Sequence, residues 1–123
     1  MKYGQLLLVA IVVSILVLFF IPARIVVINK TPEKSLSQLI VEVARVYGID
    51  EERFLAVAKC ESSLNPSAVG DGGNSFGIFQ IHLPSHPTVT VEKAFDVVWT
   101  VHWSAEKFKK DPTIWSCYKI LYE

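Results

Sequence analysis

The sequence predicts a compact, mainly α-helical domain with little or no β-structure, preceded by a single N-terminal transmembrane helix. Three observations predict this class. An uncharged apolar run fills the N-terminal part, apolar residues recur at helical spacing through much of the remainder, and four glycines gather in one short interruption of that pattern. The length of 123 residues suits one folded domain.

The apolar run extends from Leu6 to Ala23 and has no charged side chain in 18 residues. At about 1.5 Å per residue, such a helix just spans a hydrocarbon core of roughly 30 Å. An uncleaved anchor is favoured over a cleaved signal, because the only cleavage candidate, Ile21-Pro22-Ala23, has a bulky residue where a small one is required. We therefore expect three regions: residues 1–23 as the membrane anchor (or signal sequence), 24–34 as a tether and 35–123 as the folded domain.

Charge and cysteine content limit what residues 35–123 can do. These residues include eight basic and eleven acidic side chains, a net charge of −3. This charge gives no electrostatic reason to expect that the domain binds nucleic acid. The two cysteines, Cys60 and Cys117, predict one disulfide outside the cytoplasm and two buried free thiols inside it. By the positive-inside rule the domain would face the cytoplasm, because more basic residues follow the apolar run than precede it: Lys2 before, and Arg24, Lys30 and Lys34 after.

Two helices are expected in the first part of the folded domain. Ser35 and Gln38 fit a capping box that opens a helix, which stops at Gly48. Asp50 caps a second helix, which ends near Leu64 because the following Asn-Pro pair cannot continue it.

The middle of the domain is less regular. Val69 to Gly77 is expected to be a loop, and Phe76 to Leu83 a short strand or a single turn. A third helix is expected from a cap at Asp96 to about Lys110, before a short closing segment.

Glu61 lies at the C-terminal end of the apolar face of the second helix, which also holds Phe54, Val57 and Ala58. Burial and the negative end of the helix dipole both raise the pKa of a carboxyl in this position. A carboxyl that stays protonated near neutral pH can act as a general acid. The alternative is a glutamate whose stem packs while its head reaches water.

Short motifs follow this glutamate: Glu61-Ser62-x-x-Asn65-Pro66, a glycine-rich loop, and Ser75-x-Gly77-x-x-Gln80. Their order and spacing closely resemble the lytic transglycosylase (SLT-type) domain of the lysozyme-like superfamily, from about Leu36 to Tyr118. The resemblance implies a lysozyme-like fold and an enzyme that cleaves peptidoglycan. In that family the Glu of the Glu-Ser motif is the only catalytic acid, which maps onto Glu61. The Gln of the Gly-x-x-Gln motif lines the glycan cleft, which maps onto Gln80.

The implied reaction breaks the β-1,4 bond between N-acetylmuramic acid and N-acetylglucosamine and leaves a 1,6-anhydro end. Most glycosidases need a second carboxylate, but here the muramic acid's own 6-hydroxyl attacks its anomeric carbon. Glu61 would donate one proton and then accept another. The resemblance implies no cofactor, and its partner is the peptidoglycan glycan strand. Because peptidoglycan lies beyond the inner membrane, we expect the domain on the extracytoplasmic side, or secreted if the N-terminal segment is cleaved.

Other residues are expected in the substrate-binding wall. Gln80 offers two donors and an acceptor to a sugar, and the alternative is that it braces its own loop. Gly77 would let the backbone approach the sugar closely. The weaker candidates are Ser75, Asn65 and Phe79, which stands where the family usually has Met.

The end of the chain departs from the family pattern. Many members carry an Ala-Tyr-Asn-x-Gly stretch whose Tyr supports the catalytic Glu, and only Trp115-Ser116-Cys117-Tyr118 is comparable here. Tyr118 would be the tyrosine that supports Glu61 if Cys117 forms a disulfide with Cys60, the residue next to Glu61. Otherwise it is a packed surface tyrosine.

Two other functions stay open. A hydrolytic muramidase would use water, with Asp71 or Asp96 as its second carboxylate. A non-catalytic glycan-binding envelope protein would keep the cleft, although the intact glutamate disfavours it. His82 and His86 have the spacing of a zinc-binding helix, but the intervening and following prolines forbid that helix, so no metal site is expected.

Overall fold

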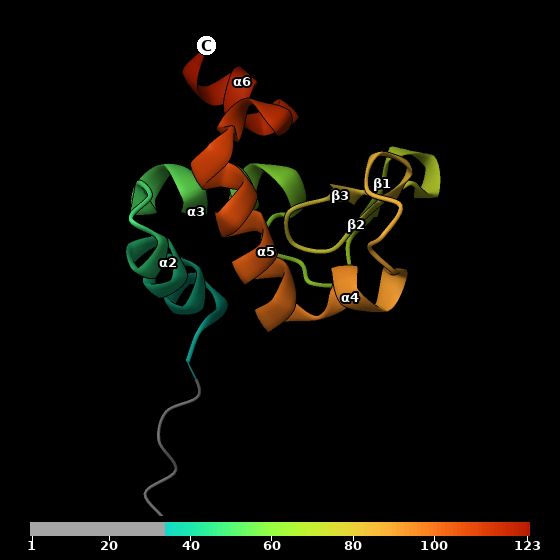
Figure 1. The fold of residues 1–123 in the computed structure, drawn as a ribbon, viewed down its shortest axis with the longest axis horizontal. Helices are drawn as coiled ribbons and strands as arrows, with labels where there is room; N and C mark the ends of the chain where they lie inside the picture. Colours follow the sequence, from blue (N-terminus) through green and yellow to red (C-terminus); the bar gives the residue numbers. More distant parts are fainter. Residues whose placement is uncertain (1–33) are drawn as a thin grey trace, which may run out of the picture. The chain divides into compact units, whose positions relative to one another are not determined.

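The computed structural model of the protein describes residues 34–123. The predicted membrane anchor and nearly all of the predicted tether lie outside these residues. Within 34–123, no helix is both long enough and apolar enough to cross a membrane. The elements follow one another as in Figure 1: α2 (Leu36–Tyr47), α3 (Glu51–Ser62), β1 (Val69–Gly70), β2 (Ser75–Phe76), β3 (Ile81–His82), α4 (Val91–Phe95), α5 (Val97–Lys110) and α6 (Ser116–Tyr122).

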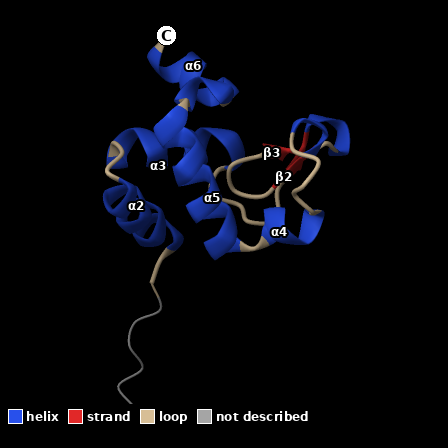
Figure 2. Cartoon of the chain, viewed as in Figure 1, coloured by secondary structure: helices blue, strands red, loops and turns tan. Residues whose placement is uncertain are grey.

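Helices dominate the described chain, and the strands form one small patch (Figure 2). The prediction of a mainly α-helical class is therefore confirmed. Short 3-10 turns at Asp71–Gly73, Leu83–Ser85 and Pro112–Ile114 connect several of the elements.

The predicted caps set the helix starts. Ser35 and Gln38 form the capping box of α2, and Gly48 ends that helix in the left-handed conformation, with φ 66°. The carboxylates of Asp50 and Asp96 accept backbone hydrogen bonds at the starts of α3 and α5.

Two boundaries differ from the prediction. Helix α3 ends at Ser62, two residues before the expected Leu64, because Ser63 and Leu64 both adopt left-handed conformations. Helix α4 was not predicted at all. It is only five residues long, too short to show an apolar period, and the Thr90 side chain caps it by accepting from the Lys93 N–H.

The main core forms where α2 and α3 pack together and against α5. Phe54 is fully buried on the predicted face of α3. It stacks on Phe79, with ring centroids 4.6 Å apart, and meets the edge of Phe108 from α5 at 5.1 Å. Because α5 also packs against α4, it connects this core to the side of the domain that carries the sheet (Figure 1).

The strands form an antiparallel sheet in the order β1-β2-β3, with Phe76 opposite both Val69 and Ile81. The prediction of a loop from Val69 to Gly77 is therefore wrong in part, because the two-residue strands β1 and β2 flank the 3-10 turn at Asp71–Gly73. Gly77 has φ 76° and lies against the Ala94 carbonyl of α4, where a Cβ atom would collide. The absence of a side chain at Gly77 thus lets the sheet rest on α4.

Candidate active site

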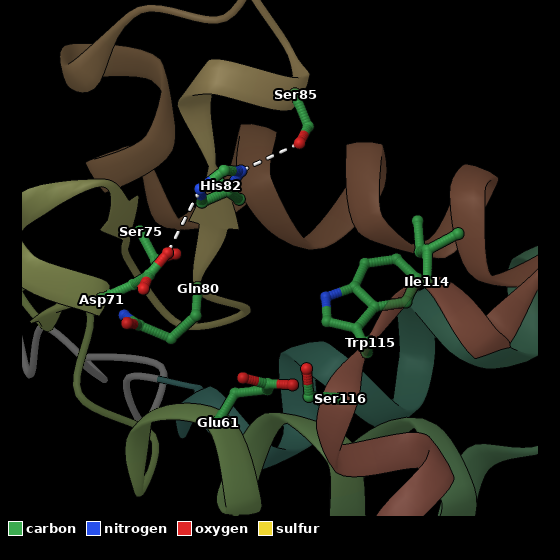
Figure 3. A pocket seen from close by; sticks show the side chains of 9 residues that line it. All are labelled: Glu61, Asp71, Ser75, Gln80, His82, Ser85, Ile114, Trp115 and Ser116. Carbon is green, nitrogen blue, oxygen red and sulfur yellow. Dashed lines mark hydrogen bonds and ion pairs between the residues drawn. The ribbon is translucent and has the colours of Figure 1, made fainter.

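A cavity of about 520 Å³ lies between the α3–α6 junction and the small sheet. Figure 3 shows Glu61 and Ser116 on one side and His82 on the opposite side. The walls come from segments far apart in the chain: Glu61 from α3, four residues from the sheet region (Asp71, Ser75, Gln80 and His82), Ser85 just after it, and Ile114, Trp115 and Ser116 at the start of α6.

Glu61 is half-buried in the last turn of α3, and its Oε1 accepts a hydrogen bond from the Cys117 N–H at 3.1 Å. Burial raises the pKa of the Glu61 carboxyl above its ordinary value, and the Cys117 hydrogen bond opposes this in part because it favours the charged form. Within residues 34–123 the carboxyl has no salt-bridge partner. Desolvation therefore decides its protonation.

A disulfide joins Cys60 to Cys117, which lie 57 positions apart in the chain and have Cα atoms 5.9 Å apart. It connects the last turn of α3 to the first turn of α6. Cys60 precedes Glu61, and Cys117 is the residue whose N–H binds the Glu61 carboxyl. The covalent link therefore fixes both partners of the hydrogen bond that orients the acid.

Gln80 lines the cavity and also braces the sheet. Its Nε2 donates to the Gly77 carbonyl at 2.9 Å and to the Ala68 carbonyl at 3.3 Å. Its Oε1 lies over Gly70, where an added Cβ atom would collide with it. With both amide hydrogens engaged, the oxygen is the group left to accept a hydrogen bond from a ligand. The buried Ser75 lines the same wall.

Three of the predicted wall residues do not line the cavity. Phe79 is fully buried between Phe54 and Trp115, so it belongs to the core. Gly77 faces α4 instead of open space. Asn65 is exposed on the turn after α3, where its Oδ1 accepts from the Ser67 N–H.

Tyr118 also lies off the cavity. Its hydroxyl accepts from Arg53, and its ring packs edge-on against Phe108. The expectation that it supports Glu61 is corrected: the support comes instead from the neighbouring Cys117 N–H. Residue 118 points away from the cavity because successive residues of a helix face different directions.

The sheet side of the cavity carries a hydrogen-bonded network that the sequence did not reveal. Asp71 Oδ2 lies 3.1 Å from His82 Nε2, and His82 Nδ1 lies 2.9 Å from Ser85 Oγ (Figure 3). Of the two aspartates considered as second carboxylates, Asp71 lines the cavity, whereas Asp96 does not and instead caps α5.

Trp115 and Ser116 were also missed as wall residues. Trp115 is largely buried, and its indole N–H donates to the Phe79 carbonyl at 2.9 Å. The available signal was the cysteine pair, because a Cys60–Cys117 bond brings the residues just before Cys117 next to Glu61.

A family model, the transglycosylase SLT domain, matches residues 38–110, well over half of the chain. The chain belongs to the transglycosylase SLT domain family. No curated protein and no solved structure matches it. Family membership supports a glycan-cleaving function of the lytic transglycosylase type and a peptidoglycan ligand.

The cavity combines residues inside the matched range with residues beyond it. Glu61, Ser75 and Gln80 fall inside the matched residues, whereas Trp115 and Ser116 fall beyond them. The disulfide joins the part of the wall beyond the match to α3, the helix that carries Glu61. The site thus combines one desolvated carboxyl, capable of proton transfer, with a hydrogen-bonding wall suited to sugar hydroxyl and amide groups.

Proposed function

We propose that this SLT domain is a peptidoglycan lytic transglycosylase that cleaves the β-1,4 bond between N-acetylmuramic acid and N-acetylglucosamine. Glu61 is the single acid and base, and the product carries a 1,6-anhydro end. The observation that carries the proposal is the half-buried Glu61 carboxyl, whose pKa is raised by burial, in a cavity with a polar opposite wall. Such a carboxyl holds its proton closer to neutral pH than an exposed glutamate.

The reaction proceeds in two proton transfers. Glu61 gives its proton to the glycosidic oxygen as the bond from that oxygen to the anomeric carbon of muramic acid breaks. The 6-hydroxyl oxygen of the same sugar then forms a bond to the anomeric carbon and releases its proton to the Glu61 carboxylate. No water is consumed, and Glu61 returns to its starting protonated state.

The Cys117 N–H serves the second half of this cycle. It holds Oε1 of Glu61 at 3.1 Å, and a hydrogen bond to the charged form stabilises the carboxylate that exists between the two transfers. Because the donor is a backbone group fixed by the disulfide, little reorganisation is needed when the charge develops.

A hydrolytic muramidase is the second candidate, and one observation favours it. Asp71 lines the same cavity as Glu61, from the opposite wall. A water held between the two carboxyl groups would be the nucleophile of such an enzyme. However, Asp71 is already bonded to His82, which directs its carboxylate along the sheet wall.

Product mass separates these functions. Purified glycan strands treated with the wild-type chain should yield fragments with an anhydro end, lighter by one water than hydrolysed fragments. The Asp71→Asn variant should give the same anhydro product. If the wild-type chain instead forms hydrolysed fragments with reducing ends, and the Asp71→Asn variant does not, the protein is a muramidase. If no cleaved product forms, the protein is a non-catalytic glycan-binding protein.

We also propose a location for the domain. Residues 1–23 anchor it as a single-pass membrane protein, or direct its secretion if they are cleaved, and residues 35–123 lie on the extracytoplasmic side. The disulfide supports an oxidising compartment, and the peptidoglycan ligand is found beyond the inner membrane. Protease added to whole cells with a permeabilised outer membrane should digest the domain. Full protection from external protease would contradict this location.

A further inference from the structure

Three side chains on the sheet wall form a hydrogen-bonded series that the proposed glycan reaction does not use. Asp71 Oδ2 lies 3.1 Å from His82 Nε2, and His82 Nδ1 lies 2.9 Å from Ser85 Oγ (Figure 3). A carboxylate only accepts hydrogen bonds, so Nε2 carries the proton of the neutral imidazole. Nδ1 is then an acceptor, and the Ser85 hydroxyl donates to it. The series therefore consists of a hydroxyl, a base and a carboxylate, in that order.

This order of groups activates a serine as a nucleophile. An imidazole next to the hydroxyl takes its proton as the oxygen attacks, and the carboxylate holds the imidazole in the correct tautomer and stabilises its charged form. Both contacts lie within the range of about 2.6–3.2 Å that such a series requires. Geometry, and not position in the chain, identifies an activated serine of this kind.

The backbone fixes the three groups in place. His82 lies in β3, paired with Ser75 of β2, and Ser85 lies three positions later in a 3-10 turn that contains Pro84. Asp71 opens the turn after β1 with φ 51°, a conformation that non-glycine residues rarely adopt. Such strained residues are concentrated at functional sites. A strained residue therefore supplies the carboxylate of the series.

An ester can reach the Ser85 hydroxyl. Ser85 is exposed and lines the cavity of about 520 Å³ that also holds Glu61. The Ser75 hydroxyl lines the same cavity. A hydroxyl can donate to the carbonyl oxygen of an ester, where negative charge develops during attack. The cavity thus offers both a nucleophile and a donor for that oxygen.

The proposed glycan reaction indicates which ester this series would take. In that reaction the 6-hydroxyl of muramic acid is the nucleophile, so an acyl group on its oxygen would block cleavage. A site that removes the acyl group would restore the hydroxyl in the cavity where Glu61 acts. The substrate class is therefore an acyl ester of a sugar hydroxyl.

We propose that Ser85, His82 and Asp71 form a second active site, which hydrolyses acyl esters on the glycan. This inference rests on the proposed function, which supplies the glycan as substrate. The Ser85 oxygen forms a bond to the ester carbonyl carbon while its proton passes to His82 Nδ1. The bond from that carbon to the sugar oxygen then breaks, and Nδ1 gives the proton to the sugar oxygen. Water cleaves the acyl-serine by the same route, which releases a carboxylic acid and restores the Ser85 hydroxyl.

The test uses the whole chain and p-nitrophenyl acetate, a small acyl ester whose hydrolysis needs no glycan. Released p-nitrophenol gives the rate, and mass spectrometry of acid-quenched protein locates the acetyl group on the chain. The variants are Ser85→Ala, His82→Asn and Asp71→Asn. The matched control is Ser67→Ala, a change at a serine that is also exposed but does not line the cavity.

Ser85→Ala and His82→Asn should each lower the rate about 100-fold, because the nucleophile or its base is lost. Asp71→Asn should lower it about tenfold, because the Asp71 carboxylate is well exposed and water screens its charge. Ser67→Ala should match the wild type. In the wild type the acetyl group should be found on Ser85, and this result decides the matter if a variant lowers the melting temperature.

A rate that Ser85→Ala leaves unchanged, or an acetyl group found only on other residues, would overturn the second active site. The three side chains would then only brace their turns. Glycan strands acetylated with acetic anhydride test the substrate, and the wild type should release acetate from them. No release from these strands would overturn the glycan ester as substrate. Acetate release without any anhydro product would instead overturn the proposed function and leave this site standing.

Discussion

The two walls of the cavity are built in opposite ways. On the α3–α6 wall, one carboxyl, Glu61, is half-buried, and a disulfide fixes its backbone partner. On the sheet wall, Asp71 and His82 are well exposed and are held by hydrogen bonds between side chains. Asp71 and Gln80 there also adopt positive φ values, 51° and 48°, which non-glycine residues rarely do.

The difference separates proton transfer from ligand recognition. A carboxyl that is desolvated and has no cation nearby keeps its proton, as a general acid requires. A wall of exposed hydrogen-bonding groups instead offers contacts to hydroxyl and amide groups. Changes on the first wall should therefore abolish turnover, and changes on the second should weaken binding.

The largest expected effect is on the Glu61 wall. Glu61→Gln keeps the shape and the Cys117 hydrogen bond but has no acidic proton, so kcat should fall by roughly 10²- to 10⁴-fold while glycan binding persists. Steady-state assays on soluble glycan strands measure this. Asp71→Asn is the matched carboxyl change on the opposite wall and should cost far less. Turnover within a few-fold of wild type in Glu61→Gln would remove Glu61 from its role.

Loss of the disulfide should have the next largest effect. It closes a loop of 57 positions, which on the chain-entropy model stabilises the fold by about 4 kcal/mol, a large share of the 5–15 kcal/mol typical of a domain. Denaturant unfolding of the wild type with and without reductant measures this loss.

Activity should fall with the disulfide as well, because the Cys117 N–H would no longer be held against Glu61. The double variant Cys60→Ala/Cys117→Ala is the control, since reductant should not change it further. An unfolding midpoint in the wild type that reductant leaves unchanged would contradict a stabilising role.

A moderate effect is expected from Gly70→Ala on the sheet wall. Gly70 has an extended backbone that alanine adopts easily, but the new methyl group would push the Gln80 amide from its place. Glycan affinity should fall by about fivefold to tenfold, the equivalent of one lost hydrogen bond of about 1 kcal/mol.

Gln80→Ala is the companion to this change. It should lower both affinity and melting temperature, because it also removes the hydrogen bonds to Ala68 and Gly77. If either variant keeps wild-type affinity in its folded fraction, Gln80 only braces the sheet and takes no part in binding.

The smallest expected effect is a pH-dependent gain in stability. Because the pKa of Glu61 is raised in the folded state, the folded protein binds this proton more tightly than the unfolded chain does. The stability that this gives is complete below the ordinary pKa of 4.5 and is lost as the pH rises through the raised value. Glu61→Gln stays neutral, so its melting temperature should rise relative to wild type as the pH increases. A difference that does not vary with pH would contradict this.

The parts of the fold that the sequence predicted depend on local signals. Ser35, Asp50 and Asp96 are caps whose side chains bond to the backbone three positions away, so a short window of sequence suffices to find them. The buried face of α3, and Glu61 at its end, follow from apolar spacing within a single helix.

The sheet wall depends on pairing between segments, which spacing does not reveal. Strands of two residues carry no alternation, so the contact of Asp71 with His82 could not be predicted. Phe79 was misplaced for a related reason. Ile78 and Phe79 are both buried in the core, whereas the next residue, Gln80, adopts a left-handed conformation and lines the cavity, and residue spacing does not reveal that conformation.

The central claim is that burial, without a partner charge, makes Glu61 the acid of this cavity. The most direct test is an NMR titration of the Glu61 side-chain carboxyl in isotope-labelled protein, assigned by comparison with Glu61→Gln. The midpoint should lie above the 4.5 of an ordinary glutamate, and the high-pH limb of kcat/KM should follow it. A midpoint at or below 4.5 would mean that the Cys117 hydrogen bond outweighs burial, and Glu61 could not hold its proton for catalysis.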